Sequence, residues 1–352
     1  MSRIFVISAI LLTLSACQLG NNPETRPEPA VDPSPEQFFA KGADISWATE
    51  MESRGYTFRN REGKEMECTA LMKELGMNTV RLRVWVNPTA GWCAKEDVLT
   101  KARRAQDLGM RIMIDFHYSN WWADPGKQNV PEAWKEFDAD RMAQAVESHT
   151  SEVLQYLKDA GIDVTWVQVG NEVENGMLWE SGRVSGQKAD TFIKYFNAGA
   201  RAVKEIYENA YVILHTSNSW NAGTLTWFYD LMRTGGADYD IIGLSLYPSY
   251  WENGAYPDWK AKTEKAVYNF KMLHERYSKP VMLVEFGMPN ALPEASRDCL
   301  EYILDNTVGY EWFKGVILWE PEAEKSRFNY EYGAFSNGMP TVALDPFKTH
   351  QI

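Results

Sequence analysis

The sequence has few of the residues that metal centres and thiol chemistry require. Its 352 residues include 4 cysteines and 5 histidines, and no C-x-x-C, H-x-x-H or H-E-x-x-H pattern occurs. We therefore expect no cofactor, no metal site and no thiol nucleophile. Cys68 and Cys93 are the only cysteines close enough in sequence to suggest a disulfide in an exported chain, which would leave Cys299 over. A buried free thiol is the alternative for at least one of the three.

Positive charge is also scarce. The chain carries 36 Lys and Arg against 48 Asp and Glu, which gives a formal net charge of −12, and no basic cluster offsets it. Nucleic acid and anionic bilayers would be repelled by such a chain. The composition therefore argues against both as main partners.

No long apolar run follows the first seventeen residues. Near the N-terminus, Ile4–Leu14 is apolar but too short to span a bilayer, and the tetrapeptide LSAC ends at Cys17. This pattern predicts a bacterial lipoprotein signal peptide over residues 1–16 and a lipid on Cys17; an ordinary signal peptide is the alternative. Residues 17–40 read as a flexible tether. We expect a protein anchored by lipid at a bacterial cell envelope, with its orientation, at the surface or facing the periplasm, left open.

Apolar runs typical of buried parallel strands recur through the rest of the chain. There are eight of them: Lys41–Trp47, Asn78–Val86, Arg111–Tyr118, Asp163–Glu172, Tyr211–Asn218, Tyr239–Pro248, Lys279–Gly287 and Lys314–Glu320. Helical periodicity lies between them, at Glu96–Leu108, Ala139–Ala160, Ala189–Tyr207, Lys260–Tyr277 and Glu294–Asp305. Eightfold βα alternation predicts one α/β domain, a (β/α)₈ TIM barrel over residues 41–352. A doubly wound sheet is the alternative, but no Gly-rich phosphate turn follows any strand.

Two glutamates end predicted strands more than a hundred residues apart. Glu172 closes the fourth strand and Glu285 lies near the end of the seventh. The carboxyl ends of barrel strands carry the chemistry in this fold. Two carboxyl groups facing one cleft are the minimum that cleavage of a glycosidic bond requires.

Other polar and aromatic residues gather at the same strand ends. The candidate binding residues are Arg81, Arg83, His117, Trp122, Asn171, Asn218, Trp220, Tyr247 and Trp319. Arg81 and Arg83 have a second interpretation, as structural partners of buried carboxylates such as Asp115. For the tryptophans the alternative is core filling, since the chain holds 14 of them. His117 is expected to donate a hydrogen bond to a sugar rather than to bind a metal.

Five motifs together resemble a known family. They are GNE at 170–172, VEFG at 284–287, TVRLRVWVNP at 79–88, DFHYS at 115–119 and WADP at 122–125. Over about residues 41 to 345 the chain resembles glycoside hydrolase family 53, the endo-β-1,4-galactanases that act on type I (arabino)galactan, a pectic polymer.

Some bacterial relatives bind calcium after the seventh strand. The matching stretch 288–296 has one carboxylate, Glu294, so no calcium site is expected.

The resemblance also implies roles for single residues. Glu172 matches the general acid/base and Glu285 the nucleophile of a retaining mechanism, and Asn171 the residue that contacts the sugar 2-hydroxyl. Arg81 matches an arginine near the nucleophile, Tyr247 a tyrosine beside the site, and Trp319 a platform under the sugar. Asn120 departs from the family, where an acid is common. The resemblance implies a β-1,4-galactan partner, and we expect a monomer.

Two other functions stay open on the sequence. One is a related β-glycanase, such as a mannanase, a xylanase or an exo-galactosidase, which would keep both glutamates. The other is a catalytically silent, lipid-anchored glycan-binding protein. The absence of an obvious occluding domain favours an open groove and internal cleavage of the polymer.

Overall fold

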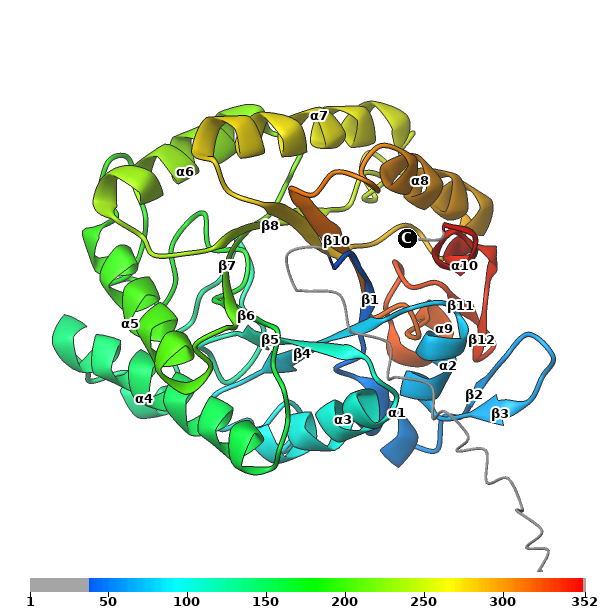
Figure 1. Cartoon of the computed structure of the whole chain (residues 1–352), viewed down its shortest axis with the longest axis horizontal. Coiled ribbons are helices and arrows are strands. Elements are labelled where there is room, and N and C mark those ends of the chain that lie inside the picture. Colours follow the sequence, from blue (N-terminus) through cyan, green and yellow to red (C-terminus); the bar gives the residue numbers. More distant parts are fainter. Residues whose placement is uncertain (1–37, 351–352) are drawn as a thin grey trace, which may run out of the picture.

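A closed barrel of eight parallel strands forms the centre of the protein (Figure 1). The computed structural model describes residues 38–350. The barrel strands are β1 (Ala40–Asp44), β4 (Thr79–Val84), β5 (Arg111–Phe116), β6 (Trp166–Val169), β7 (Tyr211–Thr216), β8 (Ile241–Leu246), β9 (Val281–Phe286) and β10 (Phe313–Trp319). Each falls within, or within one residue of, a strand that the sequence predicts. The predicted single (β/α)₈ TIM barrel is confirmed.

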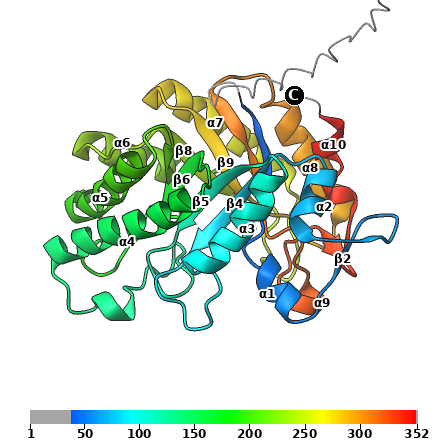
Figure 2. The same ribbon diagram turned by 60° about the horizontal axis from the view of Figure 1, so that its bottom comes forward.

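Helices cover the outside of the barrel, as Figure 2 shows for α3, α4 and α5. Five helices match the sequence prediction to within one residue at each end: α3 (Lys95–Asp107), α4 (Ala139–Asp159), α5 (Asp190–Ile206), α7 (Lys260–Tyr277) and α8 (Pro293–Asp305). Two more, α2 (Cys68–Glu74) and α6 (Ala222–Gly235), are not among the five helical ranges named from the sequence. The α6 sequence is rich in aromatic and β-branched residues, which weakens a helical signal. Its ends are nonetheless well defined, because the Asn221 side chain accepts a hydrogen bond from Thr224 N and Gly236 adopts φ 74°.

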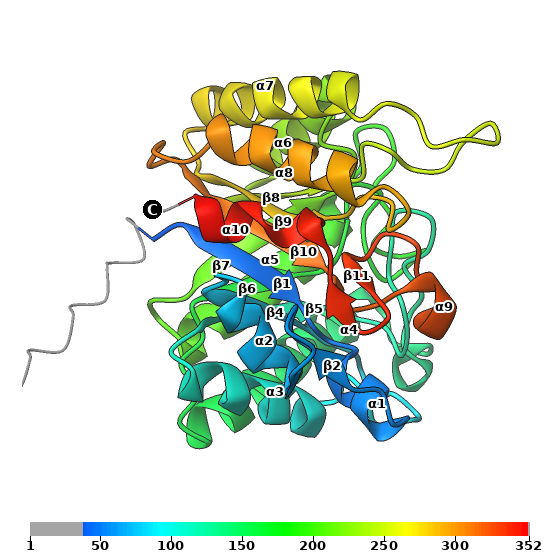
Figure 3. The same ribbon diagram turned by 90° about the vertical axis from the view of Figure 1, so that its right-hand side faces the viewer.

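Smaller elements complete the chain between the barrel strands. They are α1 (Ala48–Ser53), β2 (Phe58–Arg59), β3 (Glu65–Met66), η1 (Glu132–Trp134), α9 (Lys325–Phe328), β11 (Phe335–Ser336), β12 (Met339–Pro340), η2 (Val342–Leu344) and α10 (Pro346–Thr349). β2 pairs with β3, and β11 with β12, in two antiparallel ribbons. Two long connections, β8 to α7 and β10 to β11, extend at the end of the barrel where β1 finishes (Figure 3).

The barrel interior divides into an apolar part and a charged part. One buried apolar cluster joins residues from β1, β5, β6, β7, β8, β9 and β10: Ala40, Met113, Trp166, Ile213, Ile241, Met282, Val284 and Ile317. Toward the carboxyl ends of β1, β4, β5 and β9, Asp44, Arg81, Arg83, Asp115 and Glu285 are all buried. Buried charges are costly unless they are paired, so this second part requires a defined set of ion pairs.

All three cysteines within residues 38–350 are buried free thiols, so Cys68 and Cys93 form no disulfide. Within that same range no helix is both long enough and apolar enough to cross a membrane. The predicted signal peptide and the predicted lipidation site Cys17 lie outside the described residues.

Candidate active site

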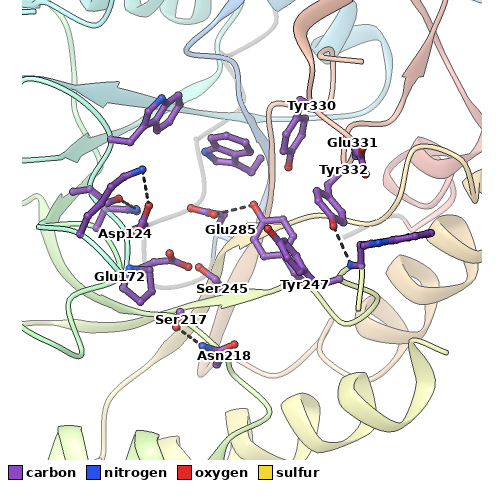
Figure 4. A pocket seen from close by; sticks show the side chains of 18 of the residues that line it. Asp124, Glu172, Ser217, Asn218, Ser245, Tyr247, Glu285, Tyr330, Glu331 and Tyr332 are labelled. Atoms are coloured by element: carbon purple, nitrogen blue, oxygen red, sulfur yellow. Dashed lines mark hydrogen bonds and ion pairs between the residues drawn. The ribbon is translucent and has the colours of Figure 1, made fainter. Parts of the chain in front are cut away.

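A cavity of about 1250 Å³ opens at the carboxyl ends of the barrel strands. Nine of the eleven predicted catalytic and binding residues line it: His117, Trp122, Asn171, Glu172, Asn218, Trp220, Tyr247, Glu285 and Trp319. Arg81 and Arg83 do not line the cavity and are fully buried beneath it. In Figure 4 the side chains of Glu172 and Glu285 come from opposite sides of the site, and their carboxyl groups point into the same space.

Glu172 follows β6 after a two-residue turn through Gly170 and Asn171. Its φ of 48° lies in the left-handed region, which is uncommon for a residue with a side chain. Asn218 after β7 and Glu320 after β10 share this conformation, with φ of 51° and 44°. Non-glycine residues in this region concentrate at functional sites, where the surrounding structure holds them. The conformation turns the Glu172 carboxyl away from the strand and into the cavity.

Ser245 and His215 support the Glu172 carboxyl. The Ser245 hydroxyl is a hydrogen-bond donor to Glu172 and lies 2.8 Å from Nε2 of His215. Nδ1 of His215 lies 3.3 Å from the backbone nitrogen of Glu172 and 3.1 Å from Oδ1 of Asn171, so the ring contacts the groups on both sides of this turn. The pKa of His215 is held well below its usual value by burial and by Arg81, which keeps this ring neutral.

Glu285 lies in β9 with its carboxyl held by two groups. Oε1 accepts a hydrogen bond from the Tyr247 hydroxyl at 2.8 Å, and Oε2 lies 3.5 Å from Nη2 of Arg81. Oε2 makes no hydrogen bond with the described residues. Burial raises the pKa of Glu285 to about 7, while Arg81 and Tyr247 act in the opposite direction. Tyr247 therefore holds one oxygen of this carboxylate, and the other is buried against Arg81.

The two carboxyl groups influence each other's titration. Burial raises the pKa of Glu172 well above its usual value, and the negative charges of Glu285 and Glu174 raise it further. Glu285 has Arg81 beside it and Glu172 has no cation in that position, so the first proton leaves Glu285. As the pH rises, Glu285 therefore ionises before Glu172, and between the two ionisations the site holds a protonated Glu172 beside an ionised Glu285. This is the pairing of acid and nucleophile that retaining hydrolysis requires.

Arg81 organises the charged layer below the cavity. Its guanidinium makes ion pairs with Asp44 at 2.7 Å and Asp115 at 2.9 Å, in addition to the longer contact with Glu285. It also donates hydrogen bonds to Gln168 Oε1 at 3.1 Å and Asn171 Oδ1 at 3.0 Å. Arg81 is thus a structural partner of buried carboxylates, and it also stabilises the charge of Glu285. Direct contact with a ligand in the cavity is not available to it.

Asn171 has little freedom to move. Besides the bond from Arg81, its Oδ1 accepts from Gln168 Nε2 at 3.1 Å, and its Nδ2 donates to the carbonyl of Ala123 at 2.9 Å. A side-chain amide has two N–H donors, so one remains for a ligand. The amide is thus preorganised as a single donor beside Glu172.

Both ring nitrogens of His117 have partners in the protein. Its Nε2 lies 2.9 Å from Asp115, and its Nδ1 accepts the backbone N–H of Ala123 at 3.1 Å. Both ring nitrogens are therefore occupied by protein groups, and no donor is left for a sugar. Burial lowers the pKa of His117, which keeps the ring neutral. The histidine lines the cavity and holds Ala123 and the following loop in place.

Arg83 serves a cluster of tryptophans rather than the cavity itself. It pairs with Glu320 at 3.1 Å, and its guanidinium carbon lies 3.9 Å from the ring centre of Trp122. The Trp122 and Trp319 rings lie 5.5 Å apart at 65° and both border the cavity. A cation against the indole face stabilises the position of Trp122. Trp122 and Trp319 therefore pack in an aromatic cluster and also border the cavity.

Asn120, which stands where relatives often carry an acid, bridges two loops. Its Nδ2 donates to the carbonyl of Val86 at 2.6 Å, and its Oδ1 accepts the backbone N–H of Glu132 at 2.7 Å. It does not line the cavity. Across residues 38–350 no group of three or more His, Cys, Asp or Glu side chains is arranged to hold a metal ion.

One side of the cavity was not predicted from sequence. It is built by the β8–α7 connection and by the segment around α9, and its lining residues are Tyr250, Trp251, Glu252, Tyr256, Lys262, Lys325, Asn329, Tyr330, Glu331 and Tyr332. Apart from Lys262 in α7 and Lys325 in α9, these residues lie in loops without helical or strand periodicity. The available signal was composition alone, in the aromatic-rich segments 247–259 and 328–332.

Comparisons with known proteins agree with this geometry. A family model described as "Glycosyl hydrolase family 53" matches residues 40–312. The chain is 29% identical over 304 residues to a probable arabinogalactan endo-beta-1,4-galactanase A of Aspergillus tubingensis, covering 80% of this chain and 84% of that protein. It is 32% identical over 255 residues to an endo-beta-1,4-galactanase of Bacillus subtilis, covering 70% of this chain and 56% of that protein.

Solved structures give the same result. A structure described under "Structure of two fungal beta-1,4-galactanases" superimposes with a TM-score of 0.80 at 25% identity, covering 89% of this chain and 100% of the other. The Ignisphaera aggregans GH53 catalytic domain gives 0.77 at 25% identity, with 88% and 95% covered. A psychrophilic family 10 endo-beta-1,4-xylanase gives 0.61 at 13% identity, with 89% and 98% covered, which is similarity of fold alone.

Proposed function

Because the chain belongs to glycosyl hydrolase family 53 and is a glycoside hydrolase, we propose that it cleaves β-1,4-galactosidic bonds inside type I (arabino)galactan with retention of configuration. The observation that carries the proposal is the carboxyl pair of Glu172 and Glu285, of which only Glu285 has a cation beside it. The relatives named as β-1,4-galactanases supply the substrate class.

In the proposed mechanism, the Glu285 carboxylate, which borders the cavity, attacks the anomeric carbon. Tyr247 and Arg81 hold the carboxylate in position and keep it ionised. Glu172 donates its proton to the leaving glycosidic oxygen, so that the departing sugar leaves as a neutral alcohol. The products of this step are a glycosyl ester on Glu285 and a shortened chain.

In the second step the ionised Glu172 takes a proton from water, and the water oxygen attacks the anomeric carbon of the ester. The carboxylate of Glu285 leaves, and Glu172 recovers its proton. Two displacements at the same carbon restore the original configuration. Asn171 contributes its remaining N–H to the sugar bound between the two carboxyl groups.

An open cavity of about 1250 Å³ favours internal cleavage. Pockets for single small molecules usually measure about 300–1,000 Å³, so this one accommodates several sugar units. An exo-acting site would require a wall that stops the chain end. The cavity instead continues along the β8–α7 connection.

The test is a time course of product lengths on linear β-1,4-galactan, with mannan and xylan in parallel. Early release of mixed intermediate oligomers from galactan alone is expected, and NMR of the first products should show the β-anomer. Glu285→Ala should lose about three or more orders of magnitude in kcat, as loss of a catalytic nucleophile does. Release of α-anomer, cleavage of mannan or xylan instead, or no new reducing ends would contradict the proposal.

We also propose that a lipid on Cys17 holds the enzyme, as a monomer, at a bacterial envelope. Support comes from the short apolar run before the tetrapeptide LSAC and from the Pro- and Asn-containing segment that follows. In a bacterial host, labelled fatty acid should enter the wild-type protein, and Cys17→Ser should release it from the membrane fraction. Membrane retention of the unlabelled Cys17→Ser protein would contradict lipidation. Light scattering of the purified chain tests the monomer.

A further inference from the structure

Two adjacent aromatic side chains in the cavity wall are unusually exposed. Tyr250 is 56% exposed and Trp251 is 50% exposed, and both lie in the β8–α7 connection that lines the cavity. Other large apolar residues with such exposure in the described chain, such as Tyr268 and Tyr310, lie outside the cavity lining. Large apolar surface left open to water inside a cleft marks a place where a ligand binds.

The two rings are held rigidly rather than loosely. The Tyr250 ring stacks on Tyr332 with centroids 5.0 Å apart and planes 8° from parallel. The backbone N–H of Trp251 donates to the Tyr332 hydroxyl at 3.1 Å, and the Trp251 ring packs edge-on against Tyr256 at 4.7 Å. Tyr332 comes from the segment after α9, so the platform joins two distant parts of the chain.

A second set of contacts holds the β8–α7 connection against the segment after α9. The Tyr256 hydroxyl donates to Glu331 Oε2 at 2.9 Å, and Lys325 forms an ion pair with Glu331. The backbone N–H of Asn290, in the short connection after β9, donates to the carbonyl of Glu331 at 2.7 Å. An aromatic surface whose own partners fix its orientation loses little conformational entropy when a ligand binds.

The platform lies beyond the catalytic carboxyl pair. Tyr247, which bonds Glu285, packs edge-on against Tyr332 at 5.7 Å and against Tyr250 at 6.4 Å. In Figure 4, Tyr332 lies on the far side of Tyr247 from Glu172. A sugar stacked there is therefore not the one whose bond is cut. It belongs to the same cavity but occupies a separate place along it.

The polar residues beside the rings suit a sugar and not an apolar ligand. Glu252, Lys262, Lys325 and Glu331 border the cavity around the two rings. A pyranose presents C–H groups on its faces and hydroxyls at its rim. Flat aromatic faces ringed by charged donors and acceptors match both features at once.

We propose that Tyr250 and Trp251 form a distal subsite that binds a galactosyl unit of the main chain away from the cleaved bond. This inference rests on the proposed galactanase function. The subsite adds affinity only for chains long enough to reach it. It therefore sets the dependence of the enzyme on chain length rather than the chemistry of cleavage.

The test compares Tyr250→Ala, Trp251→Ala and the double variant with wild type on β-1,4-galacto-oligosaccharides of increasing length. The ratio of kcat/KM for the longest to the shortest cleaved oligosaccharide should fall about tenfold in the double variant, which corresponds to about 1.4 kcal/mol. Tyr268→Ala, on α7 and 71% exposed, is the matched control and should keep the wild-type ratio. Trp251→Phe keeps an aromatic face and should recover part of the loss.

Binding measured without cleavage provides an independent check. In a Glu285→Ala background, calorimetry with the same oligosaccharides should show a length-dependent gain in affinity that the platform substitutions remove. An unchanged length ratio in the double variant would overturn the subsite. A loss confined to arabinose-branched galactan would also overturn it, since the rings would then hold a branch. Failure of wild type to cleave any galactan would instead contradict the proposed function.

Discussion

The Tyr247 hydroxyl donates a hydrogen bond to Oε1 of Glu285 at 2.8 Å. Burial raises the pKa of that carboxyl to about 7, and this bond is one of two contacts that oppose the rise. The other is the ion-pair contact with Arg81 at 3.5 Å. The ionisation of Glu285 near neutral pH thus depends on a balance between burial and two named neighbours.

Tyr247→Phe should shift the acidic limb of the kcat/KM profile to higher pH. The bond favours the carboxylate, so its loss raises the pKa of Glu285 further and leaves less of the active form at pH 6. A hydrogen bond to a charged group is worth about 1.5–3 kcal/mol, which predicts a shift of about one to two pH units. The pH dependence of kcat/KM on galactan measures it, with Tyr310→Phe at an exposed position as the control. An acidic limb unchanged in position would show that Tyr247 does not tune Glu285.

Gly287→Ala should weaken the hydrogen bond between Tyr247 and Glu285 by displacing the Tyr247 ring. A Cβ at Gly287 would lie 2.4 Å from Cε1 of Tyr247 and 3.2 Å from the Tyr330 hydroxyl. The Tyr247 ring must move to relieve this clash, and overpacking of a filled site costs about 1–3 kcal/mol of stability. We expect lower kcat and the same acidic-limb shift as in Tyr247→Phe.

The double variant Gly287→Ala, Tyr247→Phe separates the two effects. If the methyl group acts through the Tyr247 hydroxyl, adding it to Tyr247→Phe should shift the acidic limb little further. Additive shifts would mean that Gly287 reaches Glu285 by another route. Thermal unfolding of all variants shows whether lost activity follows from lost folding.

The site residues at the strand ends were predictable from sequence. The cavity wall built by the β8–α7 connection and the segment around α9 was not. A buried parallel strand has a nearly continuous apolar sequence, so a carboxylate such as Glu285 at its end stands out. Tyr250 and Tyr332 lie in loops 82 residues apart, where no periodicity indicates that their rings stack at 5.0 Å. Loop geometry depends on contacts between distant segments, which one sequence does not reveal.

Burial also decided roles that residue type left open. His117 and Arg83 have the chemistry to bind a sugar, and both lie on the predicted strand ends. In the structure the two ring nitrogens of His117 contact Asp115 and the backbone N–H of Ala123, and the Arg83 guanidinium lies against the Trp122 ring. Charged groups inside a barrel first satisfy each other, because an unpaired buried charge is costly.

Glu172→Gln should separate substrates by the acidity of their leaving groups. The variant cannot protonate the leaving oxygen, so kcat/KM on galactan should fall by about two to four orders of magnitude. An aryl β-galactoside or aryl galactobioside with an acidic phenol needs no proton, and formation of its glycosyl ester should be nearly normal. A burst of phenol followed by slow turnover is the expected trace. Glu285→Gln is the control and should abolish the burst. If Glu172→Gln instead lost kcat/KM equally on both substrates, the assigned roles of the two glutamates would be wrong.

A buried pair of carboxyl groups should make the protein less stable in alkali. Glu320 and Glu322 are 0% and 1% exposed, and within residues 38–350 neither carboxyl oxygen of Glu322 receives a hydrogen bond from a protein donor. Burial raises the pKa of Glu320 to about 7, with a further rise from Asp44. Burial and the charge of Glu320 raise the pKa of Glu322 well above its usual value. The folded pair therefore keeps protons that the unfolded chain releases above about pH 4.3.

The stabilising contribution of the pair is thus complete below that pH and declines as the pH rises through 7. Glu322→Gln keeps the side-chain shape, donates to Glu320 through its amide and no longer titrates. Its Tm should fall less than that of wild type between pH 5 and pH 8.5, by a few degrees. Glu264→Gln, at an exposed position on α7, should follow wild type. Parallel Tm curves for wild type and Glu322→Gln would mean that Glu322 is already ionised in the folded protein.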